Sequence, residues 1–558
     1  MGYIQGVARG QMVLMPECLD DYVSEDNPVR LIDAFVDTLD MKTCGFKKAE
    51  AASEGRPPYA PSMLVKLYVY CYFNGIRSSR KIARETSRNV EVMWLTGKLS
   101  PDFRTISDFR KVHGDALKAV FRQWNLFCSG QGLVGNECVS VDGSKFKAVN
   151  SKSNNFTAQK LDDRLRRIDA HIAKFMSEMD RADAEESYER RLSKERIAEK
   201  IQELRERKLR YEGYLDQLEQ SGDTQMSLTD PESRLMKFKD GFEVGFNVQT
   251  AVDDRHHLIT GFAVTSNPVD NGLLHDMAQG VKSDFGLVTI ETVADNGYHD
   301  RDDMARCLES GIVPNVNPDR NSGSFELQVD HEPTEISEAT RLSRNPDDIK
   351  TCLRSGVIPK IYDGLISDIR VEEIKIREDR PIETRTEMSD EQMKKLALQG
   401  YIVRDPRRNL AYCPAGEILR YSGKKSGKKV YCNRFACKNC QKKCCKAAHR
   451  EAQFAEGQII IACKAFGHTS FISKRPNRPY TLKKVVRFTF RPDERKLDKR
   501  MCLSEHPFGT VKFWDGASYL LLRGIAKATG ELALSFLGYN IKRAINVLGM
   551  QKLMAALS

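Results

Sequence analysis

Two segments of this chain share one pattern, in which an apolar, strand-like run ends on an aspartate close to a glycine. Residues 138–143 end this way at Asp142, and residues 287–297 do so at Asp295. Apolar alternation predicts strands, and residues 273–277 between the two segments have helical spacing. Strands separated by helices are typical of an α/β sheet with functional side chains at the strand ends. We therefore predict an α/β sheet that presents two carboxylates at strand ends, although Asp-Gly after a strand is also a common turn.

Length and charge narrow the class of protein. With 558 residues the chain is expected to contain three or four modules. Its net charge of +11 favours a polyanionic partner, most simply nucleic acid. No apolar run has membrane-spanning length, and the first residues lack the pattern of a signal peptide, so we expect a cytoplasmic protein. In that compartment the 15 cysteines are expected to be thiols or metal ligands rather than disulfides.

The region at 26–128 is expected to be mostly helical. A short basic helix is predicted after Ser78 or Ser79, and it follows a longer helix that begins at Pro61. Short helices with tight turns and a basic second helix resemble a helix-turn-helix module, whereas an ordinary helical bundle is the alternative. The candidate DNA-binding residues of this helix are Arg80, Lys81 and Arg84.

A heptad pattern follows the first aspartate. Apolar residues recur at alternating three- and four-residue steps from Leu161 to Met179 and again from Ile197 to Leu218, among dense charges. The simplest structure is an antiparallel coiled-coil hairpin. The same helices could instead form a dimer or lie on DNA.

A cysteine cluster predicts a structural zinc site. A Cys-x-x-Cys knuckle with further cysteines on both sides supplies four thiolates, and nearby lysines favour the thiolate form. Cys444 could replace one ligand, Cys432 is a spare candidate, and unliganded thiols are the alternative. The preferred Zn²⁺ ligands are Cys413, Cys437, Cys440 and Cys445.

Three motifs together resemble those of a known protein family. They are Val-Asp-Gly-Ser-Lys at 141–145, Ala-Asp-Asn-Gly-Tyr at 294–298 and Ser-Glu-His-Pro-Phe-Gly-Thr-Val-Lys at 504–512. They resemble the acidic triad of bacterial insertion-sequence transposases, in a group with a helical N-terminal domain and a cysteine-rich insertion before the last acid. Asn-Val-Gln-Thr-Ala-Val-Asp at 247–253 and Gly-Tyr-Asn-Ile-Lys-Arg at 538–543 are also similar to that group.

The resemblance implies a ribonuclease-H-like fold with Asp142, Asp295 and Glu505 as catalytic residues. Three carboxylates suit Mg²⁺ or Mn²⁺, which can activate an attacking oxygen and stabilise a leaving oxygen at phosphorus. Glu531, on the last long helix, is the alternative third acid.

The resemblance also implies basic residues around the glutamate. The family has a Lys seven residues after it, which fits Lys512, and an Arg four residues before it. Met501 occupies the Arg position and Arg500 stands beside it. We expect Lys512 to meet a DNA phosphate as a point charge. Pro507 and Gly509 predict that the helix after the glutamate is interrupted before Lys512.

We therefore predict an α/β protein with a ribonuclease-H-like core. The expected parts are a helical DNA-binding domain (1–135), three core parts (136–158, 223–317 and 500–558), a coiled-coil hairpin (159–222) and an insertion (318–499) with a zinc-ribbon-like segment (405–450). The expected function is cut-and-paste transposition in the bacterial nucleoid. A homodimer would act on double-stranded DNA, namely the terminal inverted repeats and the target. The alternatives are an inactive or domesticated DNA-binding protein and a ribonuclease-H-like nuclease that does not join strands.

Overall fold

The structure is a computed structural model. It describes residues 18–557 except 51–56, 184–187, 222–224, 318–322, 378–388, 407, 426, 439, 441–450, 456–457, 463–479 and 499. The chain forms two compact units, of which the first contains Met1–Lys152, Thr229–Glu373 and Lys484–Ser558, and the second contains Ser153–Leu228 and Ile374–Lys483. The insertion predicted at 318–499 is thus divided between the units. None of the described helices is long and apolar enough to cross a membrane.

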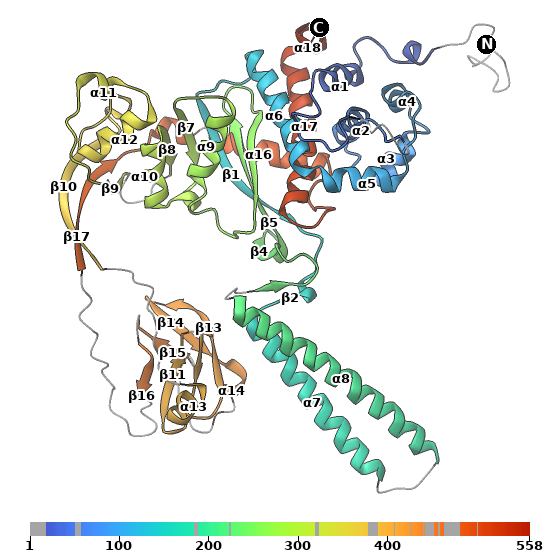
Figure 1. Cartoon of the computed structure of the whole chain (residues 1–558), viewed down its shortest axis with the longest axis vertical. Coiled ribbons are helices and arrows are strands. Elements are labelled where there is room, and N and C mark those ends of the chain that lie inside the picture. Colours follow the sequence, from blue (N-terminus) through green and yellow to red (C-terminus); the bar gives the residue numbers. More distant parts are fainter. Residues whose placement is uncertain are drawn as a thin grey trace, which may run out of the picture. The chain divides into compact units, whose positions relative to one another are not determined.

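A six-stranded sheet forms the centre of the first unit (Figure 1). Its order is β4-β5-β1-β7-β8, and β6 pairs with β5. Pairs that involve β5 are antiparallel, whereas β7 is parallel to both β1 and β8. The strands are β1 (Cys138–Lys147), β4 (Arg234–Phe238), β5 (Gly241–Asp253), β6 (Ile259–Thr265), β7 (Ile290–Ala294) and β8 (Ile312–Val316).

Helices cover both faces of this sheet because its strands carry apolar side chains on both sides. Val139 packs with α9 (Leu274–Asp284) and α10 (Arg301–Glu309) in one hydrophobic cluster. Phe146 has the opposite parity on β1 and packs in another cluster, which includes α16 (Arg500–Gly509). The sheet is therefore the middle layer of three, and the two faces of β1 meet different helices.

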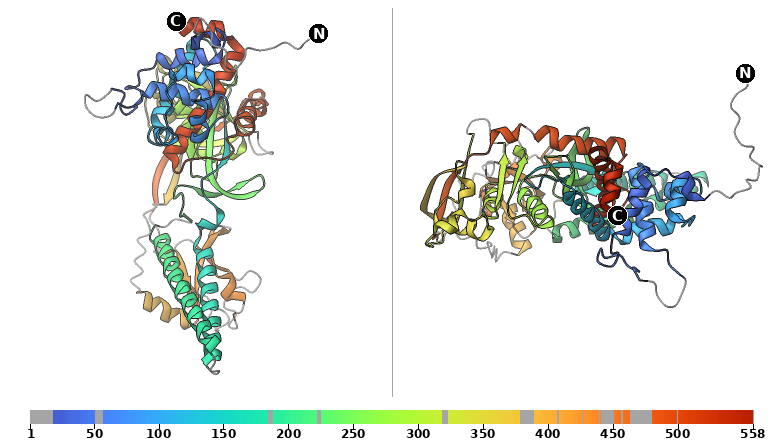
Figure 2. Two further views of the ribbon diagram at one scale, coloured as in Figure 1. Left: turned by 90° about the vertical axis from the view of Figure 1, so that its right-hand side faces the viewer. Right: turned by 90° about the horizontal axis from the view of Figure 1, so that it is seen from above.

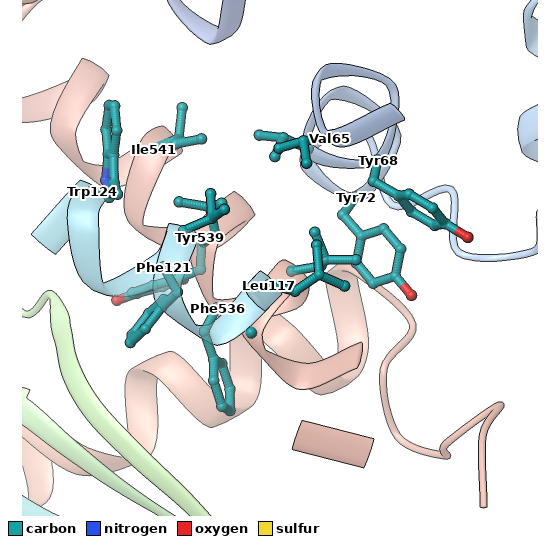
Figure 3. Close-up of a cluster of buried hydrophobic side chains, with 14 of the residues drawn as sticks. Val65, Tyr68, Tyr72, Leu117, Phe121, Trp124, Phe536, Tyr539 and Ile541 are labelled. Atoms are coloured by element: carbon teal, nitrogen blue, oxygen red, sulfur yellow. The ribbon is translucent and has the colours of Figure 1, made fainter. Parts of the chain in front are cut away.

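The N-terminal helices share their core with the C-terminal helix α17 (Ile525–Leu548), which packs against α2 and α6. Figure 3 shows this cluster, in which Tyr72, Trp124 and Phe536 come from the three helices. A Cβ atom built on Gly530 would lie 2.6 Å from the Cα atom of Gly114, so this helix crossing requires glycine. The N-terminal helices are α1 (Pro28–Asp37), α2 (Pro61–Phe73), α3 (Ser79–Glu85), α4 (Val90–Thr96), α5 (Phe103–Val112) and α6 (Gly114–Gly130). Their positions confirm the helical character predicted for 26–128.

A smaller sheet extends the first unit. In it β17 (Tyr480–Phe490) lies between β9 (Phe325–Asp330) and β10 (Ile366–Arg377). The helix α12 (Pro346–Ser355) packs against α10, and β9 does so as well. Residues between β9 and β10 therefore belong to the hydrophobic cluster beside the central sheet rather than to a separate insertion.

The second unit contains a helical hairpin and an antiparallel sheet. The helices α7 (Ala158–Asp183) and α8 (Tyr188–Ser221) lie side by side in Figures 1 and 2. Within this unit, Nη2 of Arg420 in β13 lies 3.0 Å from Oδ1 of Asp162 in α7. The sheet order is β15-β14-β13-β12-β11-β16. Its strands are β11 (Tyr401–Asp405), β12 (Leu410–Tyr412), β13 (Ile418–Lys425), β14 (Lys428–Cys432), β15 (Glu451–Phe454) and β16 (Ile460–Ala462).

Candidate active site on the central sheet

Asp142 lies in β1, and Asp295 is the first residue after β7, the strand that runs parallel to it. The register pairs Ser140 of β1 with Val293 of β7. Asp295 directly follows β7 and keeps an extended backbone, so the same register continued by two residues places Asp142 beside Asp295. Side chains two residues apart share a face, and both carboxylates therefore point to one face of the sheet. Both are half-buried.

The strand that carries Asp142 does not end there, and this corrects the expected turn. β1 continues to Lys147 because β5 pairs with it from Val139 to Lys147. Gly143 serves close packing instead: a Cβ atom at this position would lie 2.4 Å from Nε2 of Gln249 and 2.5 Å from Oδ1 of Asp270. Glycine is therefore required here because the side chains of Gln249 and Asp270 leave no room for a Cβ atom, not because the chain turns.

Asp270 is a further carboxylate that the sequence analysis missed. Its Oδ1 atom accepts hydrogen bonds from Nδ2 of Asn247 and Nε2 of Gln249, each at 2.7 Å, and lies 3.4 Å from Nζ of Lys145. Gly143 pairs with Gln249 in the β1–β5 register, so this network occupies the face opposite to Asp142. The sequence did contain a signal for such an acid. Asn247 and Gln249 alternate along a predicted strand, and buried amides need polar partners.

Tyr298 is a buried tyrosine whose hydroxyl is affected by three carboxylates. Its ring is buried, and its hydroxyl donates to Oε1 of Gln249. Burial raises the pKa of Tyr298 well above its usual value, and the negative charges of Asp270, Asp142 and Asp295 raise it further. These acids therefore act on one buried hydroxyl from the two faces of the sheet.

Glu505 lies in α16, which packs against β1 and β5. The ring of Phe508 contacts that of Phe146, with centroids 6.2 Å apart. Phe146 shares the parity of Asp142, so α16 covers the sheet face to which the two aspartates point. The side chain of Glu505 lies outside the described atoms. Among the side chains that are described, no three groups are placed to hold a metal ion.

The helix after Glu505 is not interrupted, contrary to expectation. α16 includes Pro507 and passes into a π-helical turn, Thr510–Trp514. The amide of Asp515 donates to the carbonyl oxygen of Thr510, an i−5 bond. The wider π turn continues the helix past the proline, which cannot donate to the preceding turn.

This continuation brings Lys512 to β1. Its Nζ atom donates to Oγ of Ser144 at 2.5 Å and to the carbonyl oxygen of Lys145 at 2.8 Å, and it lies 4.4 Å from the centroid of the Phe146 ring. Burial lowers the pKa of Lys512 to about 8; the charge of Lys145 also lowers it, whereas Asp142 raises it. Lys512 is therefore held beside the strand of Asp142. Arg500, at the start of α16, is half-buried.

Glu531 is not available as a third acid. Its side chain is fully buried, and Oε1 lies 2.6 Å from Nη2 of Arg77. It also accepts hydrogen bonds from the backbone amides of Leu521 and Leu522. The carboxylate of Glu531 therefore forms an ion pair and hydrogen bonds within the core of the first unit.

The predicted basic residues of α3 lie on the surface. Arg80, Lys81 and Arg84 are exposed, whereas Ile82 and Glu85 of the same helix are buried. The guanidinium of Arg80 lies 5.3 Å from the centroid of a phenylalanine ring in α5. The helix therefore presents its cations to the solvent and its apolar side to the bundle.

Three of the four predicted zinc ligands lie among the described residues of the second unit, where Cys437 packs against the hydrophobic cluster that contains Cys413. Burial raises the pKa of the Cys413 thiol, hydrogen bonds from the amides of Ala415 and Glu417 lower it, and the nearby thiols of Cys437 and Cys440 raise it. Amide donors aimed at a cysteine sulfur suit a thiolate ligand.

The fourth predicted zinc ligand is not among the described residues. Cys445 and its alternative Cys444 lie outside the described residues, and Cys432 ends β14. Within the described part of the chain, no group of three or more ligands meets the geometry of a metal site.

Comparison with known proteins gives one match. Residues 17–112 match the family described as "Transposase domain (DUF772)", which supports a transposase. The matched segment ends with α5 and includes α3. No curated protein and no solved structure matches the chain.

Proposed function

We propose that this protein is a DDE-type DNA transposase that cleaves transposon ends and joins them to target DNA. The observation that carries the proposal is the shared sheet face: Asp142 and Asp295 point to it from parallel strands, and α16, which contains Glu505, packs on it. The sheet order, with an antiparallel half and a parallel half, supports a ribonuclease-H-like core. The match at 17–112 supports the transposase class.

The carboxylates suit a hard divalent cation. Asp142 and Asp295 are half-buried, and Glu505 lies on the helix that packs against β1 and β5, so Mg²⁺ or Mn²⁺ would have oxygen ligands from three elements. The bound ions would supply activation of the attacking oxygen and stabilisation of the leaving oxygen. Lys512 is already held beside β1, where its positive charge can offset that of a DNA phosphate.

DNA binding is assigned to the helical region. The exposed cations of α3 can neutralise backbone phosphates, which supplies affinity that does not depend on the carboxylates. Joining two transposon ends in one event requires two active sites, so we expect two chains per complex with DNA.

The cysteine segment is proposed to hold one structural Zn²⁺. The thiols of Cys437 and Cys440 act on that of Cys413, whose pKa is raised mainly by burial; the amides of Ala415 and Glu417 lower this pKa and would stabilise a metal-bound thiolate. Four thiolates, completed by Cys445, would leave no position for water, so the site would support folding rather than chemistry.

The test is cleavage of a duplex that carries the element's end. Asp142→Asn, Asp295→Asn and Glu505→Gln should each abolish cleavage and leave DNA binding, measured by fluorescence anisotropy, within about twofold. Asp302→Asn, an exposed aspartate at the start of α10, is the matched control and should cleave normally. Normal cleavage by any of the three variants would refute the triad. A strand-transfer assay separates a transposase from a nuclease that does not join.

A further inference from the structure

Phe513 and Trp514 are the most exposed large apolar side chains among the described residues, at 85% and 86%. They are consecutive and end the π-helical turn that follows α16. Single exposed apolar residues are common on protein surfaces, but two adjacent aromatic rings almost wholly in water indicate a binding surface. Tyr519, half-exposed at 52%, follows on the same connecting segment.

The backbone under these two rings is fixed on several sides. Lys512 is bonded to β1, and the buried carboxylate of Asp515 lies 2.8 Å from Nζ of Lys542. The guanidinium of Arg77 donates to the carbonyl oxygen of Gly516. The rings therefore project from a rigid support, which lowers the entropy cost of binding a flat partner.

The support lies between the acidic site and α3. On one side, Lys512 contacts Ser144, two residues from Asp142. On the other, a Cβ atom at Gly75 would lie 3.9 Å from both the carbonyl oxygen of Trp514 and the Cα atom of Asp515, so the turn before α3 touches this segment. All of these residues belong to the first unit.

We propose that Phe513 and Trp514 form an aromatic platform on which unpaired DNA bases stack beside the carboxylates. This inference rests on the proposed function and deepens it, because it assigns a contact to the opened strand. Every base has a flat π face, and stacking on an aromatic ring does not depend on sequence. The neighbouring cations at Lys512 and on α3 favour a polyanion over a second copy of this basic chain.

Tryptophan fluorescence gives a direct test because the chain has three tryptophans. Trp124 is fully buried, and Trp94 is half-buried. In a Trp94→Phe background, acrylamide quenching therefore reports on Trp514. The full-length Asp142→Asn variant in this background is titrated with a duplex that has three unpaired nucleotides at one end. We expect the quenching constant to fall several-fold on binding.

Two outcomes would overturn the platform. One is unchanged quenching in a saturated DNA complex. The other is protection of Trp514 without DNA that grows with protein concentration, since a second copy would then cover the rings. If wild-type protein cleaves DNA and Trp514 stays accessible, only the platform fails. If Trp514 is protected and wild-type protein never cleaves, only the proposed function fails.

Binding measurements provide the matched controls. Trp514→Ala should weaken binding of the open-ended duplex roughly tenfold and of a fully paired duplex much less, because it removes stacking alone. Trp514→Phe should keep most of the preference. Phe242→Ala removes another exposed aromatic ring of the same unit, at 57% exposure, and should change neither affinity. Equal losses on both duplexes with Trp514→Ala would contradict stacking of unpaired bases.

Discussion

Nζ of Lys512 donates a hydrogen bond to Oγ of Ser144 at 2.5 Å, across 368 positions of the chain. Ser144 lies two residues after Asp142 on the same sheet face, and Lys512 lies seven residues after Glu505 on the continued helix. This one contact therefore ties the helix of the third acid to the strand of the first.

The lowered pKa of Lys512 predicts how stability depends on pH. Its folded pKa is about 8 and its ordinary value is 10.5, so between these values the unfolded chain binds more protons than the folded chain. Stability from this group must then rise as pH increases from 8 to 10.5. Lys512→Met should lose that gain, on the order of 2 kcal/mol between pH 7 and 10. Urea unfolding at several pH values measures it. Lys111→Met, at an exposed lysine, should keep the wild-type slope; an identical slope for both variants would contradict the burial of Lys512.

Gly143→Ala should reduce both stability and cleavage, because the new methyl group lies on the sheet face opposite to Asp142. The added methyl group would press on Gln249 and Asp270, whose mutual hydrogen bond would have to change. We expect a loss of about 1–3 kcal/mol in stability, typical of overpacking, together with slower cleavage. Gly213→Ala, in α8 with no atom within 4 Å of the new methyl group, should be neutral or slightly stabilising. Calorimetry and a cleavage assay separate the cases, and a fully active Gly143→Ala protein would show that the contact yields easily.

Glu531 and Glu505 should respond to mutation in opposite ways. Glu531→Gln leaves the buried Arg77 without its ion-pair partner, so the protein should lose about 3–5 kcal/mol of stability. Glu505→Gln should unfold like the wild type and fail to cleave. Arg77→Met combined with Glu531→Gln should cost less than the sum of the two single changes, because the pair is coupled. A stable, inactive Glu531→Gln protein would restore Glu531 as a catalytic candidate.

The zinc proposal predicts metal content. Purified protein should contain about one zinc per chain, and joint replacement Cys437→Ser with Cys440→Ser should remove it and destabilise the second unit. Cys18→Ser, at an exposed cysteine of the first unit, is the control and should keep the metal. Elemental analysis with thermal unfolding decides the question, and a zinc-free protein that is fully folded would defeat the proposal.

The local pattern of apolar residues was sufficient to predict several helices and strands of this protein. The alternation before Asp142 and Asp295 predicted β1 and β7, and the helical spacing in 26–128 predicted the N-terminal helices. The local pattern failed where contacts with residues distant in the sequence determine the backbone conformation. At Gly143 the expected turn is replaced by a continuous strand, because β5 pairs with β1 there. At Pro507 the expected break is replaced by a helix that continues into a π turn, from which Lys512 contacts β1.

The sequence by itself determined the kinds of element, the basic character of α3 and the two aspartates that follow apolar, strand-like runs, because periodicity, charge and residue type are local properties. Glu505 entered as a candidate only through the resemblance of its motif to the transposase family. Only the tertiary structure decided which acids share a face. Register places Asp142 beside Asp295, whereas Asp270 lies behind the sheet and Glu531 is held in the core by Arg77. Strand register and buried pairing join residues more than a hundred positions apart, and no local pattern encodes such contacts.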